Sequence, residues 1–121
     1  MLRKSVSIAL SMALLPPTLA FAEGLTFKVR SYHKSQVDIA FYSQQRNHSW
    51  PGGDKVWVIK DYEVHSYSLN CRDGEKICYG AWVRGSSRSY WGAGRCGRQA
   101  CQSCCFTCNG GETPVMNLNP K

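Results

Sequence analysis

Residues 25–30 read Leu-Thr-Phe-Lys-Val-Arg, and residues 37–42 read Val-Asp-Ile-Ala-Phe-Tyr. In both stretches apolar side chains recur at every second position, which is the period of a strand with one buried face. Further strands are expected at 56–59, 64–69 and 77–83, with turn-forming residues between them. Five short strands without a helical period predict an all-β fold, a small antiparallel β-sandwich or barrel.

The last third of the chain has a different composition. From Gly85 onward it is rich in Gly, Ser and Arg, and its apolar residues show little periodicity until a final expected strand at 114–118. Disulfide bonds are expected to supply most of its order. The sequence therefore predicts a disulfide-rich irregular C-terminal region attached to the sheet.

Length and composition limit the chain to one domain. It has 121 residues, of which 43% are hydrophobic, and it carries a formal net charge of +7. This composition excludes multi-domain, fibrous and largely disordered proteins. The seven cysteines indicate that the small core needs covalent support.

The N-terminus has the three parts of a secretory signal peptide, predicted over residues 1–22. Arg3 and Lys4 are followed by an apolar stretch over 6–15 and by Ala20-Phe21-Ala22, a typical cleavage site. The alternative, a short membrane anchor, is disfavoured because the apolar stretch is too short to cross a bilayer. We expect a single disulfide-stapled β domain over 23–121, secreted or periplasmic, with no stable membrane anchor.

All seven cysteines follow the expected cleavage site, and export would bring them into an oxidising compartment, where thiols pair. Cys71 and Cys78 flank the turn-forming pair Asp73-Gly74, so they could form a local bridge across a hairpin. The rest of the connectivity stays open. The residues expected in disulfides are Cys71, Cys78, Cys101, Cys104, Cys105 and Cys108.

The tail spacing Cys101-x-x-Cys104-Cys105-x-x-Cys108 resembles two zinc-binding pairs. The two pairs abut, however, and leave no excursion that would let four sulfurs close a tetrahedron. We therefore expect no metal and no cofactor.

An odd number of cysteines leaves one without a partner inside the chain. Cys96 is the candidate free thiol, because it lies between glycines and apart from the tail cluster. Arg95 and Arg98 would favour its thiolate, and such a thiol could join two copies into a disulfide-linked homodimer. In the alternative, Cys96 is bridged and a tail cysteine is free.

Few residues could carry catalysis. The histidines are His33, His48 and His65, and no Gly-x-Ser-x-Gly motif is present. His48, in a loop, could act with a lysine as a small secreted hydrolase of the nuclease type. His65 lies on the expected strand face of Tyr67, where a half-buried structural role is the simpler interpretation.

A binding role is favoured over an enzymatic one. Arg84 and Arg88 lie close in sequence to Tyr90-Trp91, and Trp50 lies in a second loop. Exposed aromatic rings among arginines can stack on sugars and attract anions. These five residues are the candidate ligand site, with an anionic polymer or a glycan as the possible partner. The alternative is that the aromatics, Trp57 and Trp82 above all, fill the core.

Several motifs resemble a group of small exported cysteine-rich proteins of Gram-negative soil bacteria, to which no activity is attached. The motifs are Phe41-Tyr42-Ser43-Gln44, Trp50-Pro51-Gly52-Gly53, the segment from Cys71 to Trp82, Trp91-Gly92 and the cysteine tail. The resemblance covers most of the chain after residue 22. It implies export to a bacterial periplasm or exterior and a single compact domain, and it implies nothing about mechanism.

Overall fold

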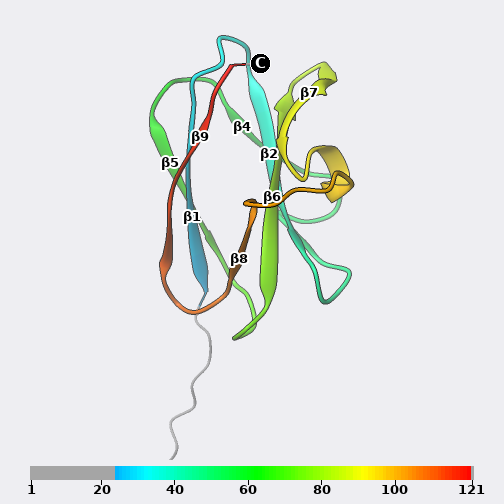
Figure 1. The fold of residues 1–121 in the computed structure, drawn as a ribbon, viewed down its shortest axis with the longest axis vertical. Coiled ribbons are helices and arrows are strands. Elements are labelled where there is room, and N and C mark those ends of the chain that lie inside the picture. The colour runs from blue at the N-terminus through cyan, green and yellow to red at the C-terminus, as the bar shows by residue number, and fades with distance from the viewer. Residues whose placement is uncertain (1–23, 121) are drawn as a thin grey trace, which may run out of the picture.

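Two β-sheets face each other in the computed structural model, which describes residues 24–120 (Figure 1). The signal peptide predicted over 1–22 lies outside the described residues. The elements are β1 (Leu25–Ser31), β2 (Val37–Ser43), β3 (Ser49–Trp50), β4 (Trp57–Ile59), β5 (Val64–Leu69), β6 (Lys76–Val83), β7 (Ser86–Gly92), the 3₁₀ turn η1 (Arg95–Gly97), β8 (Cys105–Thr107) and β9 (Glu112–Leu118).

The strands form one three-stranded and one six-stranded sheet. The smaller sheet has the order β5-β1-β9, and the larger has the order β3-β2-β6-β7, with β4 also on β2 and β8 also on β6. Strands pair antiparallel except β1 and β9, which run parallel. The predicted fold class is confirmed, and of the two architectures it is the sandwich.

The core lies between the sheets and follows from the alternation in the sequence. Phe27 of β1 and Phe41 of β2 are both fully buried, and their ring centroids are 4.6 Å apart. Ile39 and Ile77 extend the same layer. Burying each such side chain contributes about 1.5–3 kcal/mol, which fixes the inward face of every long strand. The intervening residues of β2 and β6 must therefore point outward.

The C-terminal region contains more regular structure than its composition indicates. It contributes β7, β8 and β9, and β9 lies beside β1 with Leu118 fully buried. The sequence missed β7 because its first residues are polar and exposed, and it missed β3 and β8 because they are two and three residues long. Backbone pairing to β2 and β6 holds all three.

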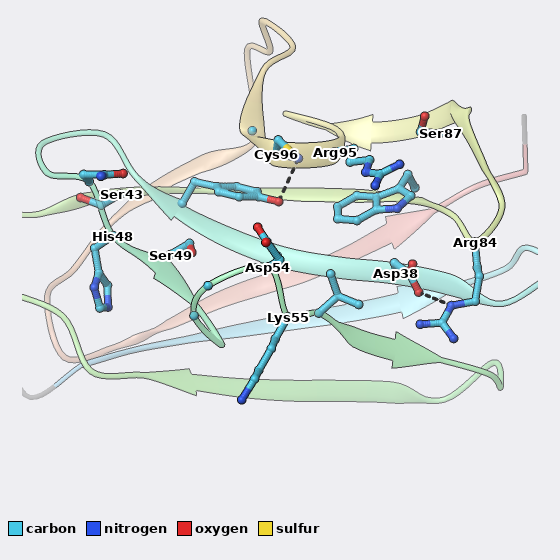
Figure 2. A pocket seen from close by; sticks show the side chains of 18 of the residues that line it. Asp38, Ser43, His48, Ser49, Asp54, Lys55, Arg84, Ser87, Arg95 and Cys96 are labelled. Atoms are coloured by element: carbon cyan, nitrogen blue, oxygen red, sulfur yellow. Dashed lines mark hydrogen bonds and ion pairs between the residues drawn. The ribbon is translucent and has the colours of Figure 1, made fainter.

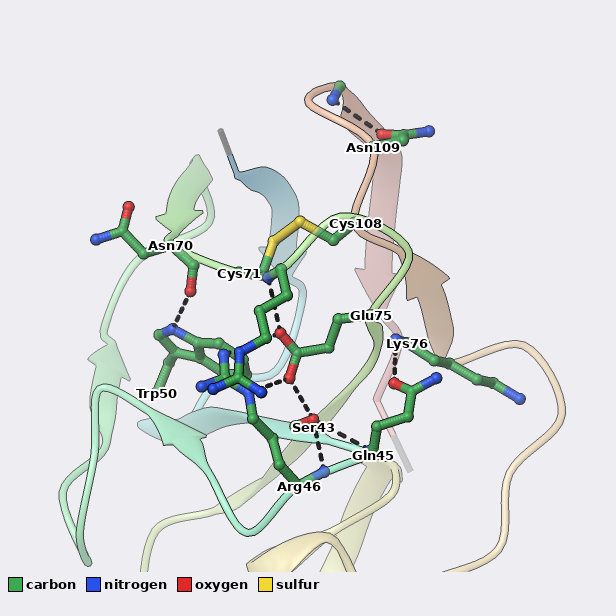
Figure 3. The surroundings of a disulfide bond; sticks show 12 residues. Ser43, Gln45, Arg46, Trp50, Asn70, Cys71, Glu75, Lys76, Cys108 and Asn109 are labelled. Atoms are coloured by element: carbon green, nitrogen blue, oxygen red, sulfur yellow. Dashed lines mark hydrogen bonds and ion pairs between the residues drawn. A yellow bond between two sulfur atoms is a disulfide. The ribbon is translucent and has the colours of Figure 1, made fainter. Parts of the chain in front are cut away.

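Three disulfides join six cysteines: Cys71–Cys108, Cys78–Cys105 and Cys101–Cys104. The local Cys71–Cys78 bridge expected from the hairpin is wrong, because Cys78 lies opposite Cys105 across the β6–β8 pair. Backbone hydrogen bonds from Gly74 to Cys108 and from Cys108 to Glu75 bring Cys108 beside Cys71 (Figure 3). The bridges indicate an oxidising compartment.

Candidate functional site

The outer face of the six-stranded sheet carries those residues of β2 that alternate with its core residues. Asp38, Ala40 and Tyr42 lie on it, since the residues between them point into the core. On neighbouring β6, Gly80 pairs with Ala40 and Trp82 pairs with Asp38.

A groove of about 1410 Å³ lies over this face (Figure 2). One wall comes from residues 84–97, at the end of β6, the start of β7 and η1, and the other wall comes from residues 43–56. Half-buried Tyr42 contributes most of the aromatic surface, because Trp82, which also lines the groove, is only 6% exposed. The hydroxyl and amide side chains are Ser43, Gln44, Asn47, Ser49, Ser86 and Ser87. The lining is therefore rich in groups that both donate and accept hydrogen bonds.

The η1 turn packs directly on Tyr42. The backbone N–H of Cys96 donates a hydrogen bond to the Tyr42 hydroxyl at 3.1 Å, and a Cβ at Gly97 would lie 2.8 Å from the Tyr42 ring. A Cβ at Gly80 would lie 2.1 Å from the carbonyl oxygen of Gly94. Glycine at 80 and 97 therefore lets this wall approach the sheet. Burial raises the pKa of Tyr42 to about 12, so its hydroxyl stays protonated and can donate into the groove.

A buried carboxylate anchors the opposite wall (Figure 3). Glu75 is 4% exposed and accepts hydrogen bonds from the Arg46 guanidinium, the Ser43 hydroxyl and the backbone N–H of Arg72. The Arg46 guanidinium also lies 5.7 Å from the Trp50 ring centroid. The hydrogen bonds from Arg46 hold the pKa of Glu75 at about 2, against the opposing effect of burial. This network ties the β2–β3 loop to the turn before β6.

The charges of the lining are unequal. Arg84 donates to Asp38 at 2.9 Å, which neutralises that carboxylate. Among the described residues, no ion pair engages Arg95, Lys55 or Asp54. Figure 2 shows Asp54 directed toward the middle of the groove and Arg95 on the η1 wall. The groove therefore offers the cation of Arg95 and the carboxylate of Asp54 to a ligand, while the Lys55 side chain extends away from the η1 wall.

A second hollow of about 440 Å³ continues around the η1 turn. It shares Ser87, Arg95 and Cys96 with the groove and adds Arg98 and Gln99. The positive surface thus extends past the wall to the far side of the turn.

Two of the five expected ligand residues are structural. Trp50 is 8% exposed and its indole N–H donates to the carbonyl of Asn70, while Trp91 is 6% exposed and its indole N–H donates to the carbonyl of Asn119. The expected exposure of Trp91 is wrong, because β7 turns this ring inward to the core. Neither indole is presented to a ligand.

The other three residues are placed differently. Arg84 lines the groove, Arg88 is exposed on β7, and Tyr90 is half-buried opposite Trp82. The structure therefore brings only one of the five, Arg84, into the groove lining.

Sequence reasoning missed Tyr42, Asp54 and Trp82. Trp82 was assigned to the core; it is 6% exposed, but it lies on the outer face beside the groove and not among the core residues. The alternation at 37–42 indicates the position of Tyr42, because neighbouring residues of a strand point to opposite faces and Phe41 points into the core. No signal could have located Asp54, since the path of its loop depends on the fold.

The histidines form no catalytic arrangement with a lysine. His48 is exposed, its ring centroid lies 4.6 Å from that of Trp50, and Figure 2 shows it and Lys55 extending away from Cys96. Within residues 24–120, no hydrogen bond to the His48 ring is found. His65, half-buried as expected, bonds Asp61 at 2.6 Å outside the groove, and this contact lowers the pKa of the Asp61 carboxyl.

Three sulfur atoms form the cysteine cluster of the described residues. The Sγ atoms of Cys78, Cys104 and Cys105 lie within 4.8 Å of one another, and thiolate sulfurs are the ligands that soft metal ions prefer. All three sulfurs are engaged in disulfides, so they offer no thiolate in this form. The tail spacing does not gather its own four cysteines, because Cys108 is bonded to Cys71.

No protein-family model matches the chain, and neither a curated protein nor a solved structure is significantly similar to it. Among residues 24–120, no helix is long and apolar enough to cross a membrane.

Proposed function

We propose that the chain is a secreted or periplasmic bacterial module that binds a segment of an acidic polysaccharide in the groove over β2 and β6. The observation that carries the proposal is the lining itself, in which hydroxyl and amide side chains surround the ring of half-buried Tyr42. Sugars present hydroxyl groups at their edges and C–H surfaces on their faces, and this lining offers partners for both.

The charges favour an acidic chain over a neutral one. Arg95 enters no ion pair in the described part of the chain, so its charge on the η1 wall is available to carboxylate or sulfate groups. A guanidinium can bind such a group through two parallel hydrogen bonds. Arg98, in the adjoining hollow, extends the same attraction along a polymer.

The groove also favours a polysaccharide over a nucleic acid. Nucleic-acid binding without sequence preference uses exposed rings on which successive bases stack. Trp50 and Trp91, the two indoles of the expected ligand site, are buried with their N–H groups already bonded to carbonyls, so they offer no such rings.

Calorimetry with an acidic and a neutral polymer tests the proposal. The purified protein without residues 1–22 is titrated with oligogalacturonate and, separately, with a dextran fragment of similar length. We expect binding of the acidic oligomer alone, weakening as salt is added. Arg95→Gln should raise the Kd about tenfold, as expected for one charge-assisted hydrogen bond.

Lys34→Gln is the matched control, since it removes the same charge from the exposed β1–β2 loop outside the groove. It should change the Kd by less than about twofold, because separated surface charges are screened. Equal losses in the two variants would show non-specific attraction to a basic protein and would contradict a groove site.

A hydrolase remains the second candidate because His48 and Lys55 both line the groove and are exposed. Incubation with RNA and with the acidic polysaccharide distinguishes the two functions. Release of fragments that is lost in His48→Ala would replace the binding proposal with the hydrolase. Intact polymer in both incubations, together with the calorimetric binding, supports the module.

A further inference from the structure

Two disulfides lie against each other where β8 meets β6. Cys105 is in register with Cys78, and the backbone N–H of Tyr79 donates to the carbonyl of Cys104 at 3.0 Å. These contacts hold two neighbouring cysteines of the tail beside a single cysteine of β6. The Sγ atoms of Cys104 and Cys105 are 3.5 Å apart although they belong to different disulfides.

We propose that Cys104 and Cys105 are interchangeable partners of Cys78. In the alternative pairing Cys78 is bonded to Cys104, and Cys101 is bonded to Cys105. All three sulfurs of the cluster lie within 4.8 Å of one another, and the Cys101 sulfur is bonded to that of Cys104, so the four sulfurs of the exchange are neighbours. This inference is independent of what the groove binds.

The exchange proceeds by thiolate attack on disulfide sulfur. An external monothiolate attacks Sγ of Cys101, which is half-buried, and the electron pair of the broken bond stays on Cys104. The Cys104 thiolate attacks Sγ of Cys78, so that a Cys78–Cys104 bond forms and the Cys105 thiolate leaves. Cys105 then attacks Sγ of Cys101 and expels the monothiolate. The number of sulfur–sulfur bonds is unchanged, and there is no net oxidation or reduction.

The third disulfide provides an internal control. Cys71–Cys108 lies outside the cluster of close sulfurs, and Cys108 is completely buried. The backbone of Cys108 is also fixed by hydrogen bonds with Gly74 and Glu75. This bridge should keep one pairing under conditions that exchange the other two.

The Cys105→Ser variant tests the proposal directly. With fixed pairing, the loss of Cys105 leaves Cys78 as the new free thiol and retains Cys101–Cys104. With interchangeable pairing, Cys78 takes Cys104, and Cys101 becomes free. Free thiols are alkylated with N-ethylmaleimide in denaturant at acidic pH, and trypsin then separates Cys78, in peptide 77–84, from Cys101, in the peptide that begins at residue 99.

We expect the new label on Cys101 in Cys105→Ser and, as a matched variant, also on Cys101 in Cys104→Ser. In Cys71→Ser the new label should be on Cys108. Labelling of Cys78 in Cys105→Ser, with Cys101–Cys104 intact, would overturn the proposal.

The wild-type protein supplies a second test that does not depend on how the variants fold. Its bridges are mapped by fragmentation mass spectrometry before and after incubation with a glutathione-type monothiol. We expect Cys78 linked to Cys104 in part of the incubated molecules and Cys71–Cys108 unchanged. A single Cys78–Cys105 linkage before and after incubation would contradict exchange.

Discussion

Glu75 is a buried, negatively charged residue. Its hydrogen-bond partners determine whether it raises or lowers the free energy of unfolding. Its pKa in the folded protein is about 2, below the ordinary 4.5, chiefly because of the hydrogen bonds from Arg46. A carboxyl group with a lowered pKa stabilises the folded state above the unfolded pKa, and this contribution is lost as the pH falls through the folded pKa. The window for Glu75 therefore runs from about pH 4.5 down to about pH 2.

The Glu75→Gln variant should lose about 3 kcal/mol of unfolding free energy at neutral pH, which corresponds to the lowered pKa of a buried group. Urea denaturation at several pH values should show the difference from wild type shrinking across the window. Glu112→Gln is the control, because its bond to Lys28 is exposed and should be worth less than about 1 kcal/mol. A cost at Glu75 that does not vary with pH would contradict this account.

Cys96 is the residue that the sequence predicts to be the free thiol. It is exposed and unpaired among the described residues, and it lines the η1 wall of the groove. The native protein should therefore take up one equivalent of a thiol reagent. A bulky maleimide adduct should weaken polysaccharide binding more than a methylthio adduct does, because only the larger group fills the groove.

A control variant and a second measurement accompany this prediction. The same maleimide should leave the binding of Cys96→Ser unaltered relative to the untreated variant. Non-reducing gels should show some disulfide-linked dimer for the wild type and none for Cys96→Ser. Dimer that persists in Cys96→Ser would place the free thiol elsewhere.

At the scale of elements, the sequence predicts those strands whose side chains build the core. Residues 25–31 alternate because every second residue is buried, and in 37–43 every second side chain, from Val37 to Phe41, belongs to the core between the sheets. Such alternation is visible in a sequence. The strand β7 has little apolar periodicity, because it is held by its backbone pairing to β6. The groove walls follow from such pairings and from the β2–β3 loop, so they could not be predicted.

Gly80→Ala should move the η1 wall. The added Cβ would lie 2.1 Å from the carbonyl oxygen of Gly94, which is backbone and cannot rotate away. The hydrogen bond from Cys96 to Tyr42 should weaken as the turn is displaced. We expect an overpacking cost of about 1–3 kcal/mol in thermal or urea denaturation, together with a higher Kd for the polysaccharide.

Gly111→Ala is the comparison, since its Cβ would meet the side-chain oxygen of Asn109 at 3.1 Å. A side chain can adjust, so the cost should be smaller and the Kd unchanged. If Gly80→Ala binds and melts like the wild type, the turn does not depend on close approach to β6.

For the molecule as a whole, the position of β9 decides whether the cysteine-rich region can unfold separately from the rest of the sandwich. Cysteines gathered at one end favoured a separate cysteine-rich region that would unfold alone on reduction. The structure instead places β9 against β1, with Leu118 in the common core, and joins β8 to β6. The two halves of the chain therefore share one core.

Reduction of the disulfides should lower the stability of the entire sandwich. Loss of a native bridge from a small domain costs about 2–5 kcal/mol. In hydrogen exchange after reduction by a phosphine, amides of β1 and β9 should lose protection together. Protection kept throughout β1 and β2 while β7 and β9 exchange freely would restore the picture of two independent regions.

The proposed binding of an acidic polysaccharide in the groove over β2 and β6 can be mapped residue by residue. Its most direct test is an NMR titration of the ¹⁵N-labelled protein with oligogalacturonate. We expect shifts of the Tyr42, Arg95 and Cys96 amides and of the Trp82 indole N–H, with the outer face of the sheet β5-β1-β9 unaffected. Shifts confined to that opposite sheet, or none at saturating oligomer, would contradict it.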